Sequence, residues 1–150
     1  MAFNSTQNTI RLILNKDLEQ MKEIWNQHHQ FLTSTGRIHT TESINNWYEN
    51  RHNDFHEYYG YFIDSVLKGF IIIRNPKNSF WIKMLAVELG FQSQGVGRAL
   101  LDFVIMKNEK NQKYTECLID NIKALNFLIT YGFKIIKYDS EYNEYTLQYE

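Results

Sequence analysis

Cysteine, proline and long apolar runs are scarce in this sequence. Cys117 is the only cysteine, which excludes an intrachain disulfide. A chain without disulfides is typical of a reducing compartment, so we expect a cytoplasmic protein. No apolar stretch approaches the ~18 residues of a membrane-spanning helix, so we expect no contact with a membrane. The single proline, Pro76, lies in a predicted turn, where it interrupts no helix or strand.

The sequence has no large excess of positive or negative charge. It contains 16 Lys and Arg residues and 17 Asp and Glu residues, which gives a formal net charge of −1. A nucleic-acid-binding protein would carry a basic stripe, so we expect no nucleic-acid partner. The first eight residues have neither the charged nor the apolar region of a signal peptide. A chain of 150 residues can bury about 70% of its unfolded surface, so we predict one domain over residues 1–150.

Hydrophobic spacing predicts the order of helices and strands. We expect a strand at 9–14, helices at 18–32 and 41–52, and three strands at 58–64, 69–74 and 79–87. A helix at 98–107, a polar connection at 107–113, a strand at 114–119, a helix at 122–131 and a hairpin of 133–138 and 142–149 follow. The helix between strands 79–87 and 114–119 predicts a right-handed parallel crossover, and the remaining strands are expected to be antiparallel.

A glycine-containing loop joins one predicted strand to the helix that follows it. The strand ends with the apolar residues Leu85, Ala86 and Val87, and the loop carries Gly95 and Gly97. The start of a helix exposes free N–H groups and the positive end of the helix dipole, and glycines let an anion approach the backbone. The loop therefore favours phosphate binding, although a lone Gly-x-Gly is also common in plain tight turns.

Two motifs in this part of the chain resemble those of a known family. Gln92-x-x-Gly95-x-Gly97 resembles the acetyl-CoA pyrophosphate loop of the GNAT superfamily, the acetyl-CoA-dependent N-acetyltransferases. Downstream, Asn121-x-x-Ala124-x-x-Phe127-Leu128-x-x-x-Gly132-Phe133 is similar to the second signature of that family. The resemblance covers residues 58–150. It implies an α/β (α+β) fold with a mixed, mostly antiparallel central sheet flanked by helices, and one parallel strand–helix–strand crossover at the cofactor slot.

The resemblance also implies acetyl-CoA as co-substrate and assigns residues to it. The backbone at residues 85–87 would hold pantetheine, the amides of residues 92–98 would hold pyrophosphate, and the side-chain amide of Asn121 would reach the pantetheine arm. A plain helix cap is the alternative role for Asn121. The implied cofactor-binding residues are Leu85, Ala86, Val87, Gln92, Gln94, Gly95, Val96, Gly97, Arg98, Ala99, Asn121, Ala124 and Phe127.

The predicted catalytic groups depart from the family pattern. Leu128 occupies the position at which the family usually has a tyrosine that acts as the general acid, and leucine cannot donate a proton. Tyr131 could replace that tyrosine, the thiolate could leave unaided because its pKa is near ~8.5, or catalysis could have been lost. The strand at 79–87 has no carboxylate, so the candidate bases are His56, Glu57, Glu116 or a water molecule.

Three classes of function follow from these residues. The first is an N-acetyltransferase that moves acetyl from acetyl-CoA to a primary amine of a small molecule or peptide, by direct attack in a ternary complex. The second is a non-catalytic acyl-CoA-binding module, and the third is a dinucleotide-binding oxidoreductase. The third lacks a further glycine at the required spacing.

His52 and His56 are four residues apart, but no third ligand is near them, so we expect no metal site. An exposed strand edge could support a homodimer.

Overall fold

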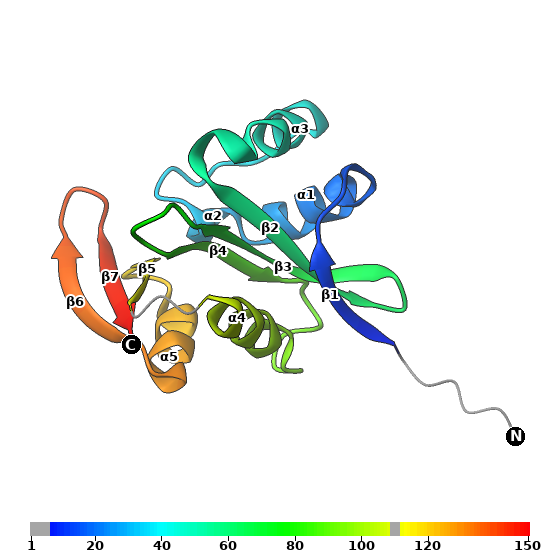
Figure 1. Ribbon diagram of the computed structural model, residues 1–150. Helices are drawn as coiled ribbons and strands as arrows, with labels where there is room; N and C mark the ends of the chain where they lie inside the picture. Colours follow the sequence, from blue (N-terminus) through cyan, green and yellow to red (C-terminus); the bar gives the residue numbers. More distant parts are fainter. Residues whose placement is uncertain (1–6, 109–111) are drawn as a thin grey trace, which may run out of the picture.

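The computed structural model describes residues 7–108 and 112–150. Parts of the N-terminal segment and of the polar connection at 107–113 therefore lie outside the described residues. Within the described residues, seven strands form one sheet in the order β1-β2-β3-β4-β5-β7-β6 (Figure 1). Among these strands, only β4 and β5 are parallel neighbours, and every other neighbouring pair is antiparallel. The predicted mixed α/β fold with one parallel crossover is confirmed.

The helices and strands follow the predicted order with shifted ends. The strands are β1 (Asn8–Leu12), β2 (His56–Ile63), β3 (Val66–Arg74), β4 (Trp81–Val87), β5 (Lys113–Leu118), β6 (Lys134–Asp139) and β7 (Glu144–Tyr149). The helices are α1 (Leu18–Gln27), α2 (His29–Leu32), α3 (Thr41–Glu49), α4 (Val96–Lys107) and α5 (Ile122–Tyr131), with single 3₁₀ turns η1 (Asn15–Asp17) and η2 (Arg51–Asp54).

Two of the predicted boundaries are wrong. The helix expected at 18–32 breaks at His28, whose backbone leaves the helical region and whose ring nitrogen bonds elsewhere, as described below. The connection expected at 64–69 is only two residues long. Asp64 and Ser65 both adopt positive φ angles, 49° and 68°, which matches the twist of a tight hairpin, so β3 begins at Val66.

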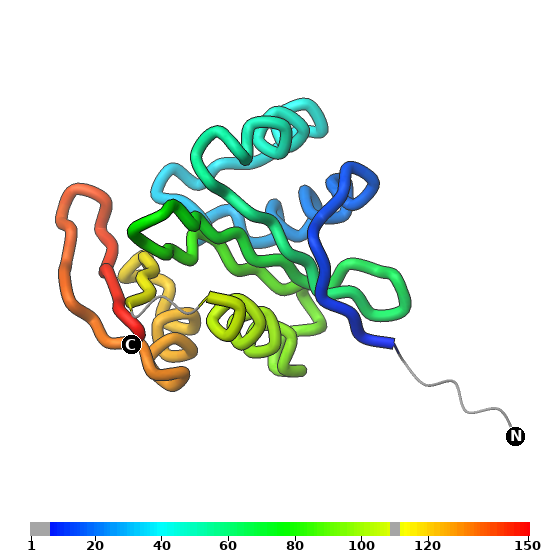
Figure 2. The backbone as a smooth tube through the Cα atoms, in the orientation of Figure 1, coloured from blue at the N-terminus to red at the C-terminus, as the bar shows by residue number. Residues whose placement is uncertain are grey.

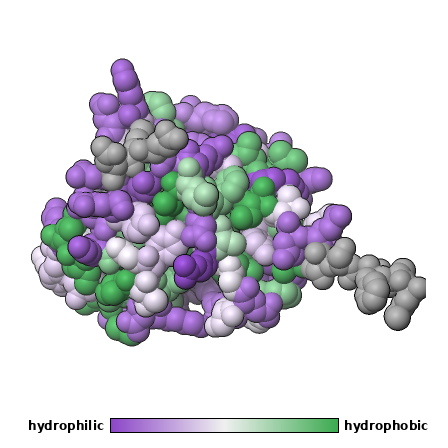
Figure 3. All heavy atoms as spheres, turned by 60° about the horizontal axis from the view of Figure 1, so that its bottom comes forward, coloured by the Kyte–Doolittle hydropathy of each residue, from purple (hydrophilic) through white to green (hydrophobic). Residues whose placement is uncertain are grey.

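The helices cover the two faces of the sheet separately. Figures 1 and 2 show α1, α2 and α3 on one face and α4 and α5 on the other, with β1 and β6 at the two edges. The first core cluster lies under α1 and α3 and contains Trp25 stacked on Phe70, with ring centroids 6.2 Å apart. The second lies under α4 and α5 and contains Ile71, Phe80 and Leu100. Hydrophilic and hydrophobic side chains are interspersed on the surface seen in Figure 3.

The parallel pair at the centre of the sheet is very short. Only Trp81 with Tyr114 and Ile82 with Thr115 are partners between β4 and β5. Beyond them the strands diverge, and β4 carries a bulge at Lys83, which has no partner on β3. The backbone of both strands past this point is left without a neighbouring strand in the gap.

Candidate functional site

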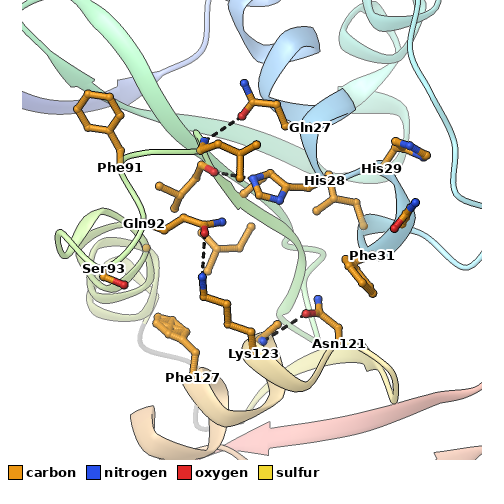
Figure 4. A pocket seen from close by; sticks show the side chains of 18 of the residues that line it. Gln27, His28, His29, Phe31, Phe91, Gln92, Ser93, Asn121, Lys123 and Phe127 are labelled. Carbon is orange, nitrogen blue, oxygen red and sulfur yellow. Dashed lines mark hydrogen bonds between the residues drawn. The ribbon is translucent and has the colours of Figure 1, made fainter.

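A pocket of about 860 Å³ occupies the gap in which β4 and β5 diverge (Figure 4). One wall comes from α1 and α2, and the opposite wall comes from the start of α4 and the first turn of α5. The ends of β4 and the residues after β5 line the space between these walls. Because α1–α2 and α4–α5 lie on different faces of the sheet, the pocket runs through the sheet from one face to the other.

The loop before α4 has the backbone geometry that an anion site requires. Gly95 is the N-cap of α4 and has a φ of 83°, and Ser93 also has a positive φ of 68°. A Cβ added at Gly95 would meet no atom within 4 Å, so nothing shields the first amides of α4 on that side. A Cβ at Gly97 would make ordinary contacts, 3.7 Å from Phe127 and from Val87. The start of α4 can therefore receive a negatively charged group.

Two positively charged side chains lie in the first turns of α4 and α5, beside the pocket. Arg98 lies in the first turn of α4, with its guanidinium 5.8 Å from the centroid of the Tyr131 ring. Lys123 lies in the first turn of α5, and its Nζ donates a hydrogen bond to Oε1 of Gln92 at 2.9 Å. Both residues add positive charge at the end of the pocket that the glycine loop closes.

Most of the predicted cofactor residues line this pocket. They are Leu85, Ala86, Val87, Gln92, Gly95, Gly97, Arg98, Asn121, Ala124 and Phe127. The structure places three others away from the lining. Nε2 of Gln94 donates to the carbonyl of Gly90, Val96 is buried in the second core cluster, and the amide of Ala99 closes the first turn of α4 on Gly95.

A histidine that no motif marks also belongs to the pocket wall. His28 occupies the break between α1 and α2, and its Nε2–H donates to the carbonyl oxygen of Val87 at 2.6 Å. This bond ties the α1–α2 segment to the end of β4. Phe31, on α2, lies on the same side of the pocket (Figure 4). Sequence spacing places both residues on a helix but gives no sign that they face the end of β4.

The structure does not bring the candidate acid Tyr131 into the pocket lining. Its hydroxyl donates to Oδ1 of Asp102 at 2.7 Å, on the side of α5 that packs against α4. Burial, together with the Asp102 carboxylate, raises the pKa of Tyr131 well above its ordinary value. Leu128 is buried in the second core cluster.

The candidate bases on β2 point to opposite faces of the sheet. Glu57 is on the face of α4, where its carboxylate accepts a hydrogen bond of 2.6 Å from the hydroxyl of Tyr59. His56 is on the face of α1 and α3, and burial lowers its pKa. Neither residue lines the pocket between β4 and β5.

A pair of carboxyl groups lies beside the point at which β4 and β5 diverge. Glu116 on β5 is bound to Lys83 of β4, with 3.4 Å between Oε1 and Nζ, and Glu144 on β7 lies opposite Leu118. Their neighbours Cys117 and Tyr145 pack into the second core cluster, so both carboxyl groups face the side of α1 and α3.

The pKa of Glu144 is raised above its ordinary value. Burial raises it to about 7, and the hydrogen bond and charge of Glu116 and the charge of Asp139 act in the same direction, while Lys83 opposes them. The sequence predicted Glu116 as a candidate base but missed Glu144. Only the register of β7 against β5, which pairs Leu118 with Glu144, reveals this residue.

None of the helices within residues 7–108 and 112–150 has the length and apolar character needed to cross a membrane. The same part of the chain holds no group of three or more His, Cys, Asp and Glu side chains arranged for a metal ion.

Comparison with known proteins gives one family match and many similar structures. The sequence model described as the acetyltransferase (GNAT) family matches residues 18–133. No curated protein matches the sequence. Ard1 from Thermoplasma volcanium is 27% identical, with 95% of this chain and 96% of that chain covered and a TM-score of 0.72.

Two other similar structures were solved with a ligand. The paia N-acetyltransferase from Thermoplasma acidophilum, in complex with coenzyme A, is 20% identical over 96% of this chain and 99% of its own, with a TM-score of 0.75. The yncA protein from Salmonella typhimurium, with its cofactor acetyl-CoA, is 19% identical over 96% and 94% of the two chains, with a TM-score of 0.75.

Proposed function

The chain belongs to the acetyltransferase (GNAT) family, and from this premise we propose that it transfers the acetyl group of acetyl-CoA to a primary amine. The acceptor is a small molecule or a peptide, and the amine attacks the thioester directly in a ternary complex. The observation that carries the proposal is the pocket between β4 and β5, which reaches both faces of the sheet. A thioester entering from one face can meet an amine entering from the other.

The face of α4 and α5 is the side proposed for the cofactor. The diphosphate would lie on the first amides of α4 beside Arg98, where the helix dipole and the guanidinium both favour negative charge. Pantetheine would then run along the side of β4 that faces the gap at residues 85–87 and pair with it as an added strand. The amide of Asn121 lies on the opposite wall, within the same pocket.

The face of α1 and α2 is the side proposed for the acceptor. An amine with a pKa near ~10.4 must lose a proton before it attacks. We assign this step to the pair Glu144 and Glu116, which lie outside the pocket lining but on the side of the sheet that carries α1 and α3. A carboxyl with a pKa of about 7 is well matched to a general base at neutral pH. His56 faces the same side and is the alternative base.

The leaving thiolate needs no side-chain acid in this proposal. Leu128 is apolar, and the hydroxyl of Tyr131 is engaged with Asp102. A thiol has an ordinary pKa near ~8.5, so its thiolate is a tolerable leaving group. Leu128 also favours a second candidate function, a module that binds acyl-CoA without turning it over, because the residue that usually supplies the proton is missing.

The test is a parallel calorimetric titration with acetyl-CoA, free CoA and NADH, followed by release of free thiol with a panel of amines. We expect both CoA ligands to bind, NADH not to bind, and thiol to appear with at least one amine. Binding without thiol release across the panel would favour the module. The proposal fails if no CoA ligand binds, and binding of NADH alone would point to the oxidoreductase.

A further inference from the structure

The strand β6 ends the sheet with an edge that no other strand of the described chain pairs with. The order of strands places β6 next to β7 alone, and Figures 1 and 2 show it as the outermost element on that side. Every side chain from Lys134 to Tyr138 is exposed, and three of these five are apolar or aromatic. An exposed edge of this kind is a template for pairing with another chain.

Two of these side chains lie on the face of the sheet that carries α4 and α5. Ile135 is the strand partner of Leu147. Tyr138 is the partner of Tyr145, and the centroids of the two rings are 5.8 Å apart. Leu147 and Tyr145 pack into the second core cluster, and residues opposite each other in antiparallel strands share a face. Ile135 and Tyr138 therefore lie on this face, although they are 44% and 51% exposed.

Two charged side chains of β6 lie on the other face of the sheet. Lys134 is the strand partner of Gln148, and Asp139 is the partner of Glu144. Gln148 and Glu144 each precede a residue of β7 that faces the second core cluster, so alternation along the strand turns them the other way. Within residues 7–108 and 112–150, neither Lys134 nor Asp139 takes part in an ion pair.

A bulge determines how β6 can pair with a second copy of itself. Ile136 has no partner on β7, and this extra residue keeps Ile135 and Tyr138 on one face although they are three positions apart. When two copies run antiparallel about a twofold axis directly after Ile136, Lys134 of each copy lies opposite Asp139 of the other. Ile135 then lies opposite Tyr138. A shift by one residue would place Lys134 opposite Tyr138, or Asp139 opposite Ile135, on mismatched faces.

We propose that a second copy of this chain pairs with β6 in this register, so that two seven-stranded sheets join edge to edge. The twofold axis repeats each contact, which gives two pairs of Lys134 with Asp139 and two pairs of Ile135 with Tyr138. Opposite charges and aromatic–aliphatic pairs between facing residues both stabilise a sheet. This interaction surface goes beyond the proposed function and does not rest on it.

The features of β6 select a second copy over an unrelated strand. Lysines and bulges on an edge strand normally oppose pairing with another chain. A second β6 contains the same extra residue, so the two strands match residue for residue, and it supplies the aspartate that faces Lys134. The strand at the other edge, β1, has no carboxylate, and its one charged residue, Arg11, is engaged with Asp17.

The test is sedimentation velocity over a range of protein concentrations. A single edge strand gives a small interface, so we expect a dissociation constant of about 1–100 μM. Lys134→Glu and Asp139→Lys each place like charges opposite each other twice, and each should raise this constant at least about tenfold. Lys16→Glu makes the same change of charge next to β1, at the other edge of the sheet, and should leave it unchanged.

An equimolar mixture of the Lys134→Glu and Asp139→Lys proteins tests the register itself. In the mixed dimer the introduced glutamate faces the introduced lysine, and the native Asp139 of one copy faces the native Lys134 of the other. The mixture should therefore dimerise at about the wild-type dissociation constant, although neither protein does so alone. Misfolded variants would not recover when they are mixed, so this result separates a lost contact from a lost fold.

The other outcomes overturn the proposal. A wild-type protein that stays monomeric at about 1 mM has no such interface, and a dimer that both variants leave intact uses another surface. Weakening by both variants without recovery in the mixture would exclude the register. A dimer that only Lys16→Glu disrupts would lie at the edge formed by β1. Calorimetry with acetyl-CoA on the same proteins tests the proposed function separately, because no residue of β6 lines the pocket.

Discussion

Oδ1 of Asn121 accepts a hydrogen bond from the amide of Ala124 at 3.3 Å and so caps α5. The two roles considered for this residue, helix cap and contact to pantetheine, are compatible. The side-chain oxygen serves the helix, and the amide nitrogen is turned away from it, within the pocket (Figure 4). One side chain can therefore hold both the start of α5 and a ligand.

The Asn121→Asp variant separates these two roles. Aspartate caps a helix about as well as asparagine but has no amide to donate. We expect the free energy of unfolding to stay the same while acetyl-CoA binds about tenfold more weakly, because a hydrogen-bond donor is replaced by a negative charge. Asn121→Ala should lose about 1 kcal/mol of stability as well. Urea unfolding and calorimetry measure the two effects, and full affinity in the aspartate variant would leave Asn121 as a cap only.

The Glu144–Glu116 pair predicts how the rate depends on pH. A general base works when it is ionised, so kcat/KM should rise with pH through about 7, the raised pKa of Glu144. Glu144→Gln should lower kcat/KM about a hundredfold and remove that acidic limb.

Variants of the neighbouring groups serve as controls for this profile. Glu116→Gln removes the carboxylate that helps to raise the pKa of Glu144, so it should move the acidic limb to lower pH. His56→Ala and Glu57→Ala should keep the limb in place. Loss of the limb in His56→Ala with an intact limb in Glu144→Gln would transfer the role of base to His56.

Leu128 allows a direct test of whether an acid limits the reaction. If the thiolate leaves unaided, Leu128→Tyr should change the rate of thiol release by less than about threefold, since the thiol is already acidic enough. Because Leu128 is buried, the larger ring should lower stability by about 1–3 kcal/mol. A gain in turnover of more than about tenfold would show that proton donation is limiting. Thermal unfolding of the same variant measures how much stability the larger side chain removes.

His39 predicts a loss of stability in acid. It is 2% exposed, its Nε2 has no hydrogen-bond partner, and its ring lies 4.5 Å from that of Trp25 and 4.8 Å from that of Trp47. Burial, with the charge of Arg37, lowers its pKa from 6.5 to about 4. The neutral form is thus favoured in the folded protein, so the stability contributed is complete above pH 6.5 and is lost as the pH falls towards 4.

The size of this effect can be measured with a variant that does not titrate. Each unit of pKa difference is worth about 1.4 kcal/mol, so the wild-type protein should lose about 3 kcal/mol between pH 7 and pH 4 from this group. His39→Phe should lack this component of the pH dependence. Urea unfolding at several pH values compares the two proteins, and equal slopes would show that other groups cause the acid sensitivity.

The sequence predicted the parts of the site that lie close together along the chain. Residues 85–98 form one strand–loop–helix unit, and Asn121 to Phe127 form one turn and helix, so local spacing is enough to place them. The face of the sheet on which α4 lies follows from the right-handedness of parallel crossovers. For these elements, the structure predicted from local sequence is the one found in the fold.

The parts that sequence reasoning missed depend on contacts between distant segments. His28 breaks a helix because its ring finds the carbonyl of Val87, 59 residues away. The position of Glu144 opposite Leu118 depends on the register of β7 against β5. Glu57 and His56 lie on different faces of the sheet because side chains alternate along β2. Hydrophobic periodicity reports the face of a strand but not which strand lies beside it.

The short pairing between β4 and β5 leaves the two parts of the sheet joined by few backbone hydrogen bonds. Only two residue pairs are strand partners between β4 and the part of the sheet that contains β5, β7 and β6. A ligand whose amides pair with the side of β4 that faces the gap would then act as the missing length of sheet and join the two parts. Its binding energy would appear as a higher melting temperature and as slower amide hydrogen exchange on both sides of the gap.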